Sequence, residues 1–250
     1  MISLEETKSE YFAKTNPYDQ KYVEFTKNHL VRTYPKGTRT GSSNYNPISH
    51  WIMGSQLVAL NYQTPDKPML LNEALFSMNG KCGYVLKSDY LRKGQLNDTN
   101  DRSLTTNAGK IKSLSIKLIS GQHIPKPGNS QDGEVVDPYV KFRVYGHPLD
   151  NNWKSTTSPV KNNGFNPVWN ESPIEFIIRC PEMAFIYIAV RDHSATGKDA
   201  LLGQYMLAFP AIMEGYRTIY LVDSDQQSLS PASLLVHIAI KDAANESIPE

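Results

Sequence analysis

Short stretches in which apolar and polar residues alternate recur through the second half of the chain, from Ile111 onward. A period of two is typical of strands with one buried and one solvated face. Turn-forming residues separate the stretches, and no long helical pattern interrupts them. Two stacked antiparallel sheets are therefore expected. The expected strands are 113–120, 137–146, 174–179, 184–192, 201–209, 216–222 and 233–241.

The first ninety residues show a mixed pattern. The run 56–62 is mostly apolar, as expected of a parallel strand that is covered on both faces. Strands that alternate with helices indicate an α/β unit. The expected helices are 5–14, 17–28 and a short one through Trp51, and the expected strands are 30–34, 56–62 and 82–86.

A polar stretch divides the chain. Its residues, KGQLNDTNDRSLTTNAG, are rich in Asn, Thr, Asp and Gly and carry few apolar side chains, which favours a linker. We therefore expect an α/β domain over residues 1–92, a linker over 93–110, an all-β domain over 111–243 and a tail over 244–250.

Composition narrows the possible partners. The 250 residues are 40% apolar and 20% charged, with a net charge of +1, so no overall field favours nucleic acid. Two cysteines, Cys82 and Cys180, form neither a disulfide framework nor a zinc motif and are expected to be reduced thiols in the cytoplasm. The N-terminus does not read as a signal peptide, and the apolar stretches are too short to span a bilayer. Any membrane contact is therefore expected to be peripheral.

Three blocks carry a family resemblance. They are HLVRTYPKGTRTGSSNYNP from His29, WIMGSQLVALNYQTPDKPM from Trp51 and CGYVLKSDYLR from Cys82. In this order they resemble the Y half of the catalytic barrel of phosphoinositide-specific phospholipase C, and the run GSQLVALNYQTPDKPM is most similar to the gamma type. A C2 domain follows the barrel in that family. The resemblance implies an α/β half of a TIM-type barrel followed by an all-β C2 sandwich.

The resemblance also implies an activity and a headgroup site. The family hydrolyses phosphatidylinositol 4,5-bisphosphate to diacylglycerol and inositol 1,4,5-trisphosphate in signal transduction. Arg32 and Tyr34, two residues apart on one strand, leave the same face. The guanidinium fork of Arg32 matches a phosphate, and the Tyr34 ring can pack on the inositol. These residues are the expected substrate-binding pair.

The same resemblance places the catalytic machinery elsewhere. Both catalytic histidines and the carboxylates that hold catalytic calcium belong to the first half of the barrel, which is expected to precede residue 1. We therefore expect no catalytic residue in this chain, little activity from it alone, and the first barrel half as a partner. His29, three residues before Arg32, would face away from the site, and His50 is expected on a helix surface. The family's headgroup-contacting serine is expected upstream, so that Ser3, with Glu6 three residues later, would cap a helix.

The C2 segment holds a second candidate site. Asp137, Asn162, Asp192 and Asp199 fall at positions that resemble calcium ligands of C2 domains, whereas Ser194 stands where a further aspartate is usual. Calcium prefers several oxygen ligands from flexible loops. We therefore expect a depleted calcium site, and the alternative is a C2 domain that only packs against the barrel.

Two broader interpretations remain open, beside a third in which the chain is an interaction piece that competes with the full enzyme for its first barrel half and inhibits it. In the first, the chain is the C-terminal part of a cytoplasmic enzyme that works peripherally at a phosphoinositide membrane surface, with possible upstream signalling proteins. In the second, it is a non-catalytic C2 lipid- or protein-binding module. Hydrolysis that appears only when the first barrel half is added would favour the enzyme. Calcium-dependent liposome binding without hydrolysis would favour the module.

Overall fold

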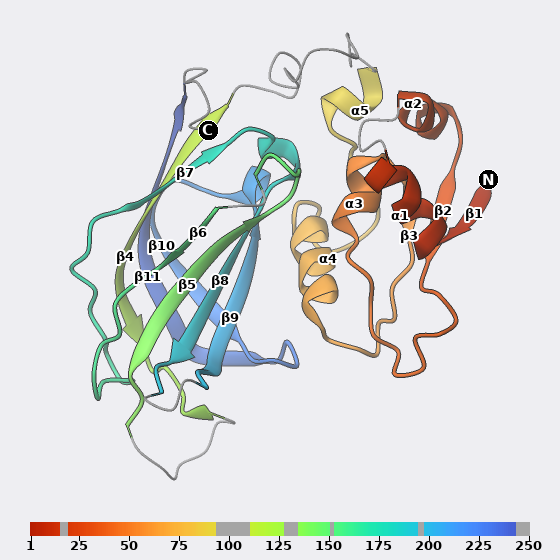
Figure 1. Ribbon diagram of the computed structural model, residues 1–250. Helices are drawn as coiled ribbons and strands as arrows, with labels where there is room; N and C mark the ends of the chain where they lie inside the picture. The colour runs from red at the N-terminus through yellow and green to blue at the C-terminus, as the bar shows by residue number, and fades with distance from the viewer. Residues whose placement is uncertain (16–19, 94–110, 128–134, 151–152, 195–197, 244–250) are drawn as a thin grey trace.

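The chain forms an α/β part and a β-sandwich that lie side by side (Figure 1). The computed structural model describes residues 1–15, 20–93, 111–127, 135–150, 153–194 and 198–243. Most of the expected linker and all of the expected tail lie outside the described residues. No helix in these ranges is long and apolar enough to cross a membrane.

A small parallel sheet organises the α/β part. Its strands are β1 (Ile2–Glu5), β2 (Val31–Tyr34) and β3 (Leu57–Val58), in the order β1-β2-β3. Both pairings are parallel. The expected strand over 30–34 is thus confirmed, while the strand expected over 56–62 is only two residues long.

Five helices accompany this sheet in the described residues: α1 (Glu6–Thr15), α2 (Gln20–Asn28), α3 (Ile48–Ile52), α4 (Lys67–Ser77) and α5 (Asp89–Lys93). The helices expected over 5–14 and through Trp51 are confirmed. Helix α4 was not expected from the sequence. Its start is marked by Asp66, whose side chain accepts a hydrogen bond from the Met69 amide, and by a proline in the first turn.

The strand expected over 82–86 is absent from the structure. Cys82, Tyr84 and Leu86 are exposed coil residues, and the Tyr84 side chain is 89% exposed. A strand needs a neighbour to pair its backbone groups. Among the described residues the three-stranded sheet ends at β3, and residues 82–86 do not pair with it.

The sandwich contains eight strands in the described residues, and all their pairings are antiparallel. Their order is β6-β5-β8-β9-β10-β11-β4-β7. A single residue pair, Val222 with Gln204, joins β10 to β9, so the structure consists of two four-stranded halves. The seven expected strands are confirmed, and only the short β6 was missed. The strands are β4 (Lys112–Gln122), β5 (Pro138–Tyr145), β6 (Lys154–Thr156), β7 (Ile174–Ile178), β8 (Phe185–Asp192), β9 (Ala200–Ala208), β10 (Gly215–Val222) and β11 (Ser228–Asp242).

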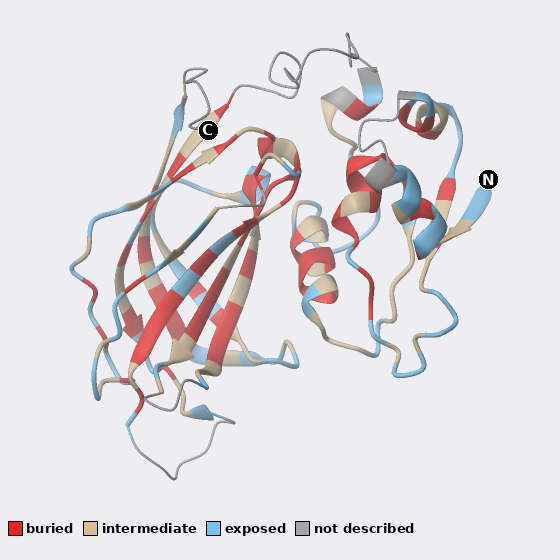
Figure 2. Cartoon of the chain, viewed as in Figure 1, coloured by how far each residue is buried: buried red, intermediate tan, exposed pale blue. Residues whose placement is uncertain are grey.

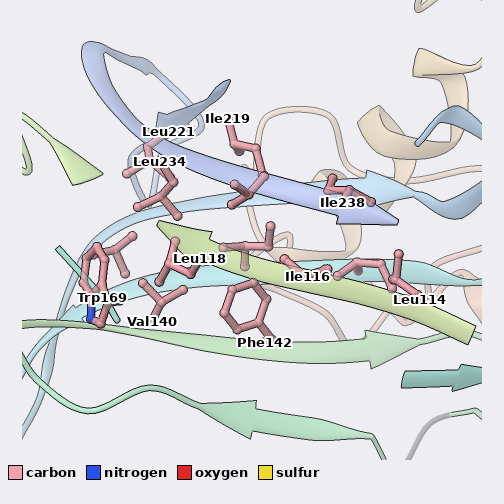
Figure 3. Packing of buried hydrophobic residues seen from close by; sticks show 14 of the residues in the cluster. Leu114, Ile116, Leu118, Val140, Phe142, Trp169, Ile219, Leu221, Leu234 and Ile238 are labelled. Carbon is pink, nitrogen blue, oxygen red and sulfur yellow. The ribbon is translucent and has the colours of Figure 1, made fainter. Parts of the chain in front are cut away.

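The core of the sandwich lies between its two halves. Leu114 and Ile116 of β4 face Phe142 of β5 across this space (Figure 3). Trp169 is 3% exposed, and its indole donates a hydrogen bond to the Ser158 carbonyl. Alternation along the strands therefore produces the expected sandwich, because every second side chain points inward.

A second core joins the two parts of the chain. Trp51 of α3 packs against Phe185 of β8, with ring centroids 5.8 Å apart. Helix α4 lies against β9, and its buried side chains Leu70 and Ala74 belong to the same cluster as Met206. Figure 2 shows buried residues on α3 and α4 as well as along the sandwich strands. The cluster formed by α3, α4, β8 and β9 is apolar, which favours a fixed arrangement of the two parts over two independent units.

Candidate functional site

The two faces of the parallel sheet have different surroundings. Thr33 of β2 lies beside Leu4 of β1 and Val58 of β3, and none of these three side chains is exposed. On the other face, Arg32 lies between Ser3 of β1 and Leu57 of β3, both of which are exposed. Helices therefore cover the Thr33 face, and the Arg32 face is the open one.

Arg32 and Tyr34 occupy this open face together. The Arg32 guanidinium carbon lies 5.0 Å from the centre of the Tyr34 ring, a cation–π distance. Both side chains are partly buried, and Tyr34 is the last residue of β2. The sequence-predicted pair is therefore adjacent in space, at the carboxyl end of a parallel strand. In such a pair the arginine fork can bind a phosphate, and the flat aromatic ring can pack against a sugar-like ring beside it.

Ser3 is the residue that sequence reasoning missed. It does not cap a helix, because β1 runs through Glu5 and α1 begins only at Glu6. Its Cα pairs with that of Arg32 in the parallel ladder, so both side chains leave the same face. The hydroxyl is thus available next to the guanidinium. The signal that could have revealed it is strand pairing, which a capping pattern of Ser3 and Glu6 obscured.

Glu6 fixes the loop that follows β2. Its carboxylate is 2% exposed and accepts two-pronged hydrogen bonds from Arg39, with Nε–Oε1 and Nη2–Oε2 distances of 2.8 Å. It also accepts the backbone amide of Lys36. The carboxylate raises the pKa of Arg39 above its ordinary value. Arg39 therefore stays protonated, and Glu6 balances its charge. The guanidinium does not supply free positive charge to the open face.

A buried polar pair supports β2 from behind. The Tyr45 hydroxyl lies 2.9 Å from the Thr33 hydroxyl, and Thr33 is fully buried. Burial raises the pKa of Tyr45 to about 12, so the phenol stays protonated. The residue between Arg32 and Tyr34 is therefore held by a hydrogen bond, which limits rotation of the strand.

The two histidines near the site have partners other than Arg32 and Tyr34. His29 follows α2, is exposed and stacks on Phe25 at 4.2 Å, away from the open face. His50 was expected on a helix surface, but it is 1% exposed and lies 2.8 Å from the Ser9 hydroxyl through Nδ1. Burial lowers the pKa of His50 to about 4. A proton-transfer role needs a ring nitrogen beside the reacting group, whereas Nδ1 of these histidines lies by the Phe25 carbonyl and the Ser9 hydroxyl.

The C2 candidate ligands gather at one end of the sandwich. Asp192 Oδ1 accepts the Asp137 amide at 2.8 Å, and Asp137 Oδ1 accepts the Asn162 amide at 2.7 Å. Asn162 has a φ of 51° and so lies in the left-handed region. Three of the four residues named from the sequence are therefore in direct contact.

Asp199 belongs to a neighbouring contact. Its Oδ2 accepts the Tyr139 hydroxyl and its Oδ1 accepts the Ser194 amide. The Tyr139 hydrogen bond is the main cause that lowers the pKa of Asp199 below its ordinary value, and the Ser194 amide adds to it. Within the described ranges, no group of three or more His, Cys, Asp or Glu side chains is arranged to hold a metal ion. A cation here would compete with the backbone amides and the Tyr139 hydroxyl, which already donate hydrogen bonds to these carboxylates.

Two family models match the chain in succession. Residues 1–90 match the Y domain of phosphatidylinositol-specific phospholipase C, and residues 112–221 match the C2 domain. The order of the two matches is the order that the sequence motifs indicated.

Curated relatives carry one kind of name. The chain is 43% identical over 215 residues to 1-phosphatidylinositol 4,5-bisphosphate phosphodiesterase delta-4 of Xenopus laevis, covering 86% of the chain and 28% of the relative. It is 40% identical over 248 residues to the eta-2 protein of Mus musculus, covering 98% of the chain and 16% of the relative. The chain thus spans less than a third of the length of these relatives. They are of the delta and eta types, so the expected likeness to the gamma type is not confirmed.

Solved structures agree with this assignment. The crystal structure of S. officinalis PLC21 superposes with a TM-score of 0.77 at 32% identity, covering 98% of this chain and 30% of that one. The L. pealei PLC21 structure gives the same TM-score at 33% identity. The chain therefore consists of a Y domain followed by a C2 domain and belongs to the phosphoinositide-specific phospholipase C family.

Proposed function

We propose that this chain is the C-terminal part of an enzyme that hydrolyses phosphatidylinositol 4,5-bisphosphate to diacylglycerol and inositol 1,4,5-trisphosphate. Residues 1–92 form half of the catalytic barrel, residues 93–110 link it to the C2 domain at 111–243, and 244–250 are a tail. The relatives' names, phosphatidylinositol 4,5-bisphosphate phosphodiesterase, support this substrate and bond.

The observation that carries the proposal is the row of Ser3 and Arg32 on the open face, with Tyr34 next to Arg32. Arg32 binds a headgroup phosphate through its guanidinium fork, and the Ser3 hydroxyl donates a hydrogen bond to the same phosphate. Tyr34 packs against the inositol ring. In barrel enzymes the active site lies at the carboxyl ends of the parallel strands, where Tyr34 ends β2.

Bond cleavage needs groups from outside these 250 residues. Hydrolysis of a phosphodiester requires a general base, a general acid and stabilisation of the anion. We assign these roles to a first barrel half that pairs with the open edges of β1 and β3. The two edge strands carry exposed apolar side chains that fit such a partner, Ile2 on β1 and Leu57 on β3.

The direct test is hydrolysis of labelled phosphatidylinositol 4,5-bisphosphate in mixed micelles with calcium. The chain is assayed alone and after mixing with the first barrel half of a related enzyme. Activity is expected only in the mixture, and Arg32→Ala is expected to remove most of it. Arg92→Ala, on the surface helix α5, is the matched control and should leave activity unchanged.

The C2 domain braces the barrel and contacts the membrane peripherally in this proposal. Its contact with α3 and α4 supports the bracing role. Calcium binds weakly at Asp137, Asn162, Asp192 and Asp199, because the ion competes with the backbone amides that donate to the three aspartate side chains. Binding of the chain to anionic vesicles should then rise with calcium in the wild type and not in Asp137→Asn.

A second candidate function is a non-catalytic C2 lipid- or protein-binding module. The observation in its favour is that the sandwich has its own closed core, whereas the parallel sheet has unpaired edges. Vesicle binding that persists while no mixture with any first barrel half hydrolyses the lipid would favour this module over the enzyme.

A further inference from the structure

A turn of the C2 domain reaches the start of helix α4. The turn between β10 and β11 is closed by Asp223, whose Oδ1 accepts the amides of Asp225 and Gln227 at 2.9 and 2.8 Å. Gln226, in the left-handed region with a φ of 61°, extends its side chain from this turn. Its Nε2 donates to the Asp66 carbonyl at 3.0 Å, across 160 residues of sequence.

A second contact holds the next residue of the same segment. The Lys67 ammonium lies 4.5 Å from the centre of the Tyr187 ring and donates to the Tyr145 hydroxyl at 3.2 Å. The Tyr187 hydroxyl donates to Gln204 Oε1, and Gln204 Nε2 donates to the Asp223 carbonyl, both at 2.9 Å. Two sets of contacts from the C2 domain therefore hold Asp66 and Lys67, and Asp223 takes part in both sets.

The Asp66 side chain connects the start of α4 to the loop after β2 through hydrogen bonds with Asn44. Its Oδ2 accepts the Asn44 amide at 2.8 Å, and its Oδ1 accepts Asn44 Nδ2 at 3.0 Å. Asn44 is 8% exposed, and its Oδ1 accepts the Asn61 amide at 2.6 Å. With donors and acceptor both engaged, the Asn44 side chain has one orientation available.

The loop in turn supports the headgroup strand. Tyr45 follows Asn44 directly and pairs with Thr33, which lies between Arg32 and Tyr34. The contacts from Gln226 to β2 are hydrogen bonds between side chains or between a side chain and the backbone. The residues that make them are mostly shielded from water, where such bonds are strongest. Every step from the C2 turn to Thr33 is a hydrogen bond, a link within one residue or one peptide bond.

We propose that Gln226 of the C2 domain is a positioning residue for the headgroup-binding strand and acts through Asp66, Asn44 and Tyr45. This inference rests on the proposed function, because β2 matters only if Arg32 and Tyr34 bind the headgroup. It assigns the C2 domain a role in substrate affinity that is separate from membrane binding.

The test compares three variants of the turn in the full chain. Gln226→Glu keeps the size and backbone strain of the side chain but removes its donor. Gln226→Lys restores a donor of similar reach. Gln227→Glu is the matched control, since the Gln227 amide group bonds only within the turn, to the Asp225 carbonyl at 3.3 Å.

The first readout is amide hydrogen exchange. The Asn44 amide bonds to Asp66, and the Ala59 amide bonds to the Thr33 carbonyl at 2.9 Å. Exchange at both amides should be about threefold to tenfold faster in Gln226→Glu, as expected for loss of one hydrogen bond, and should return to the wild-type rate in Gln226→Lys. Unchanged exchange in Gln226→Glu would overturn the inference, as would equal acceleration in Gln227→Glu.

The second readout separates this inference from the proposed function. In the mixture with the first barrel half, Gln226→Glu should raise KM about threefold to tenfold with kcat nearly unchanged. A fall in kcat at constant KM, or no change in either, would overturn the positioning role. If no mixture hydrolyses the lipid, the proposed function fails, while the exchange rates still decide whether Gln226 positions β2.

Discussion

Ser3 and Arg32 lie directly opposite each other on the parallel strands β1 and β2, and their side chains leave the same open face of the sheet. A hydroxyl and a guanidinium side by side provide donors for a single phosphate group. The two residues are 29 positions apart in the sequence, so only the pairing of the strands brings them together.

Removal of the Ser3 hydroxyl should weaken headgroup binding. A hydrogen bond to a charged group contributes about 1.5–3 kcal/mol, so Ser3→Ala should raise KM about tenfold or more in the complemented enzyme. Ser3→Thr, which keeps the hydroxyl on a strand-favouring residue, should retain most of the affinity. Equal KM values for Ser3→Ala and the wild type would exclude Ser3 from the site.

The ion pair of Glu6 and Arg39 should matter more than a surface pair. Glu6→Ala leaves the Arg39 guanidinium without its carboxylate in a largely buried position, and we expect a loss of about 2–4 kcal/mol in the free energy of unfolding. The control is Glu73→Ala, because Glu73 pairs with Lys81 at 3.4 Å on an exposed surface. That change should cost less than about 1 kcal/mol. Similar denaturant midpoints for the two variants would contradict the assigned role of Glu6.

Stability should fall as the solution is acidified below neutral pH. His50 has a pKa of about 4 in the folded chain, below its ordinary value of 6.5, because burial disfavours the charged ring. The unfolded chain therefore binds a proton first, and stability is lost between pH 6.5 and about 4. The slope per histidine reaches at most about 1.4 kcal/mol per pH unit, and His147, with the same shift, adds its own contribution.

Urea unfolding between pH 7 and 5 measures this slope. His50→Gln should make it shallower, because the buried ring that resists protonation is then absent. An identical slope in His50→Gln and wild type would show that His50 does not titrate as described.

The apolar contact between the two domains should couple their unfolding. Phe185→Ala removes a ring that is 1% exposed and packs on Trp51, so we expect a loss of about 3–5 kcal/mol. Phe165→Ala, at a ring that is 67% exposed, should cost less than about 0.5 kcal/mol.

Unfolding followed by fluorescence and by circular dichroism tests the coupling itself. The two probes should give one shared transition in the wild type and separate transitions in Phe185→Ala. Separate transitions already present in the wild type would mean that the contact does not join the domains.

Local sequence patterns predicted most of the C2 domain. Alternation marks the strand 137–146, whereas 184–192 is a nearly continuous apolar run because both faces of β8 are buried. The three-residue strand β6 escaped because so short a segment shows no period.

The α/β domain was harder to predict because its structure depends on distant pairing. Residues 82–86 have strand-like composition, but they do not pair with the edge strand β3 and therefore remain coil. Helix α4 is apolar on several sides because it is enclosed between the two domains, so it lacks the stripe that indicates a surface helix. Ser3 and Gln226 were missed for the same reason: their partners are remote in sequence.

The most direct measurement compares two lipids in the complemented enzyme. Arg32→Ala should lower kcat/KM for phosphatidylinositol 4,5-bisphosphate about 100-fold and change it little for phosphatidylinositol, which lacks the ring phosphates that Arg32 binds. Arg32→Lys should fall between, since it keeps the charge without the fork. An equal loss for both lipids, or no loss for either, would contradict the assignment of Arg32 as the headgroup phosphate ligand.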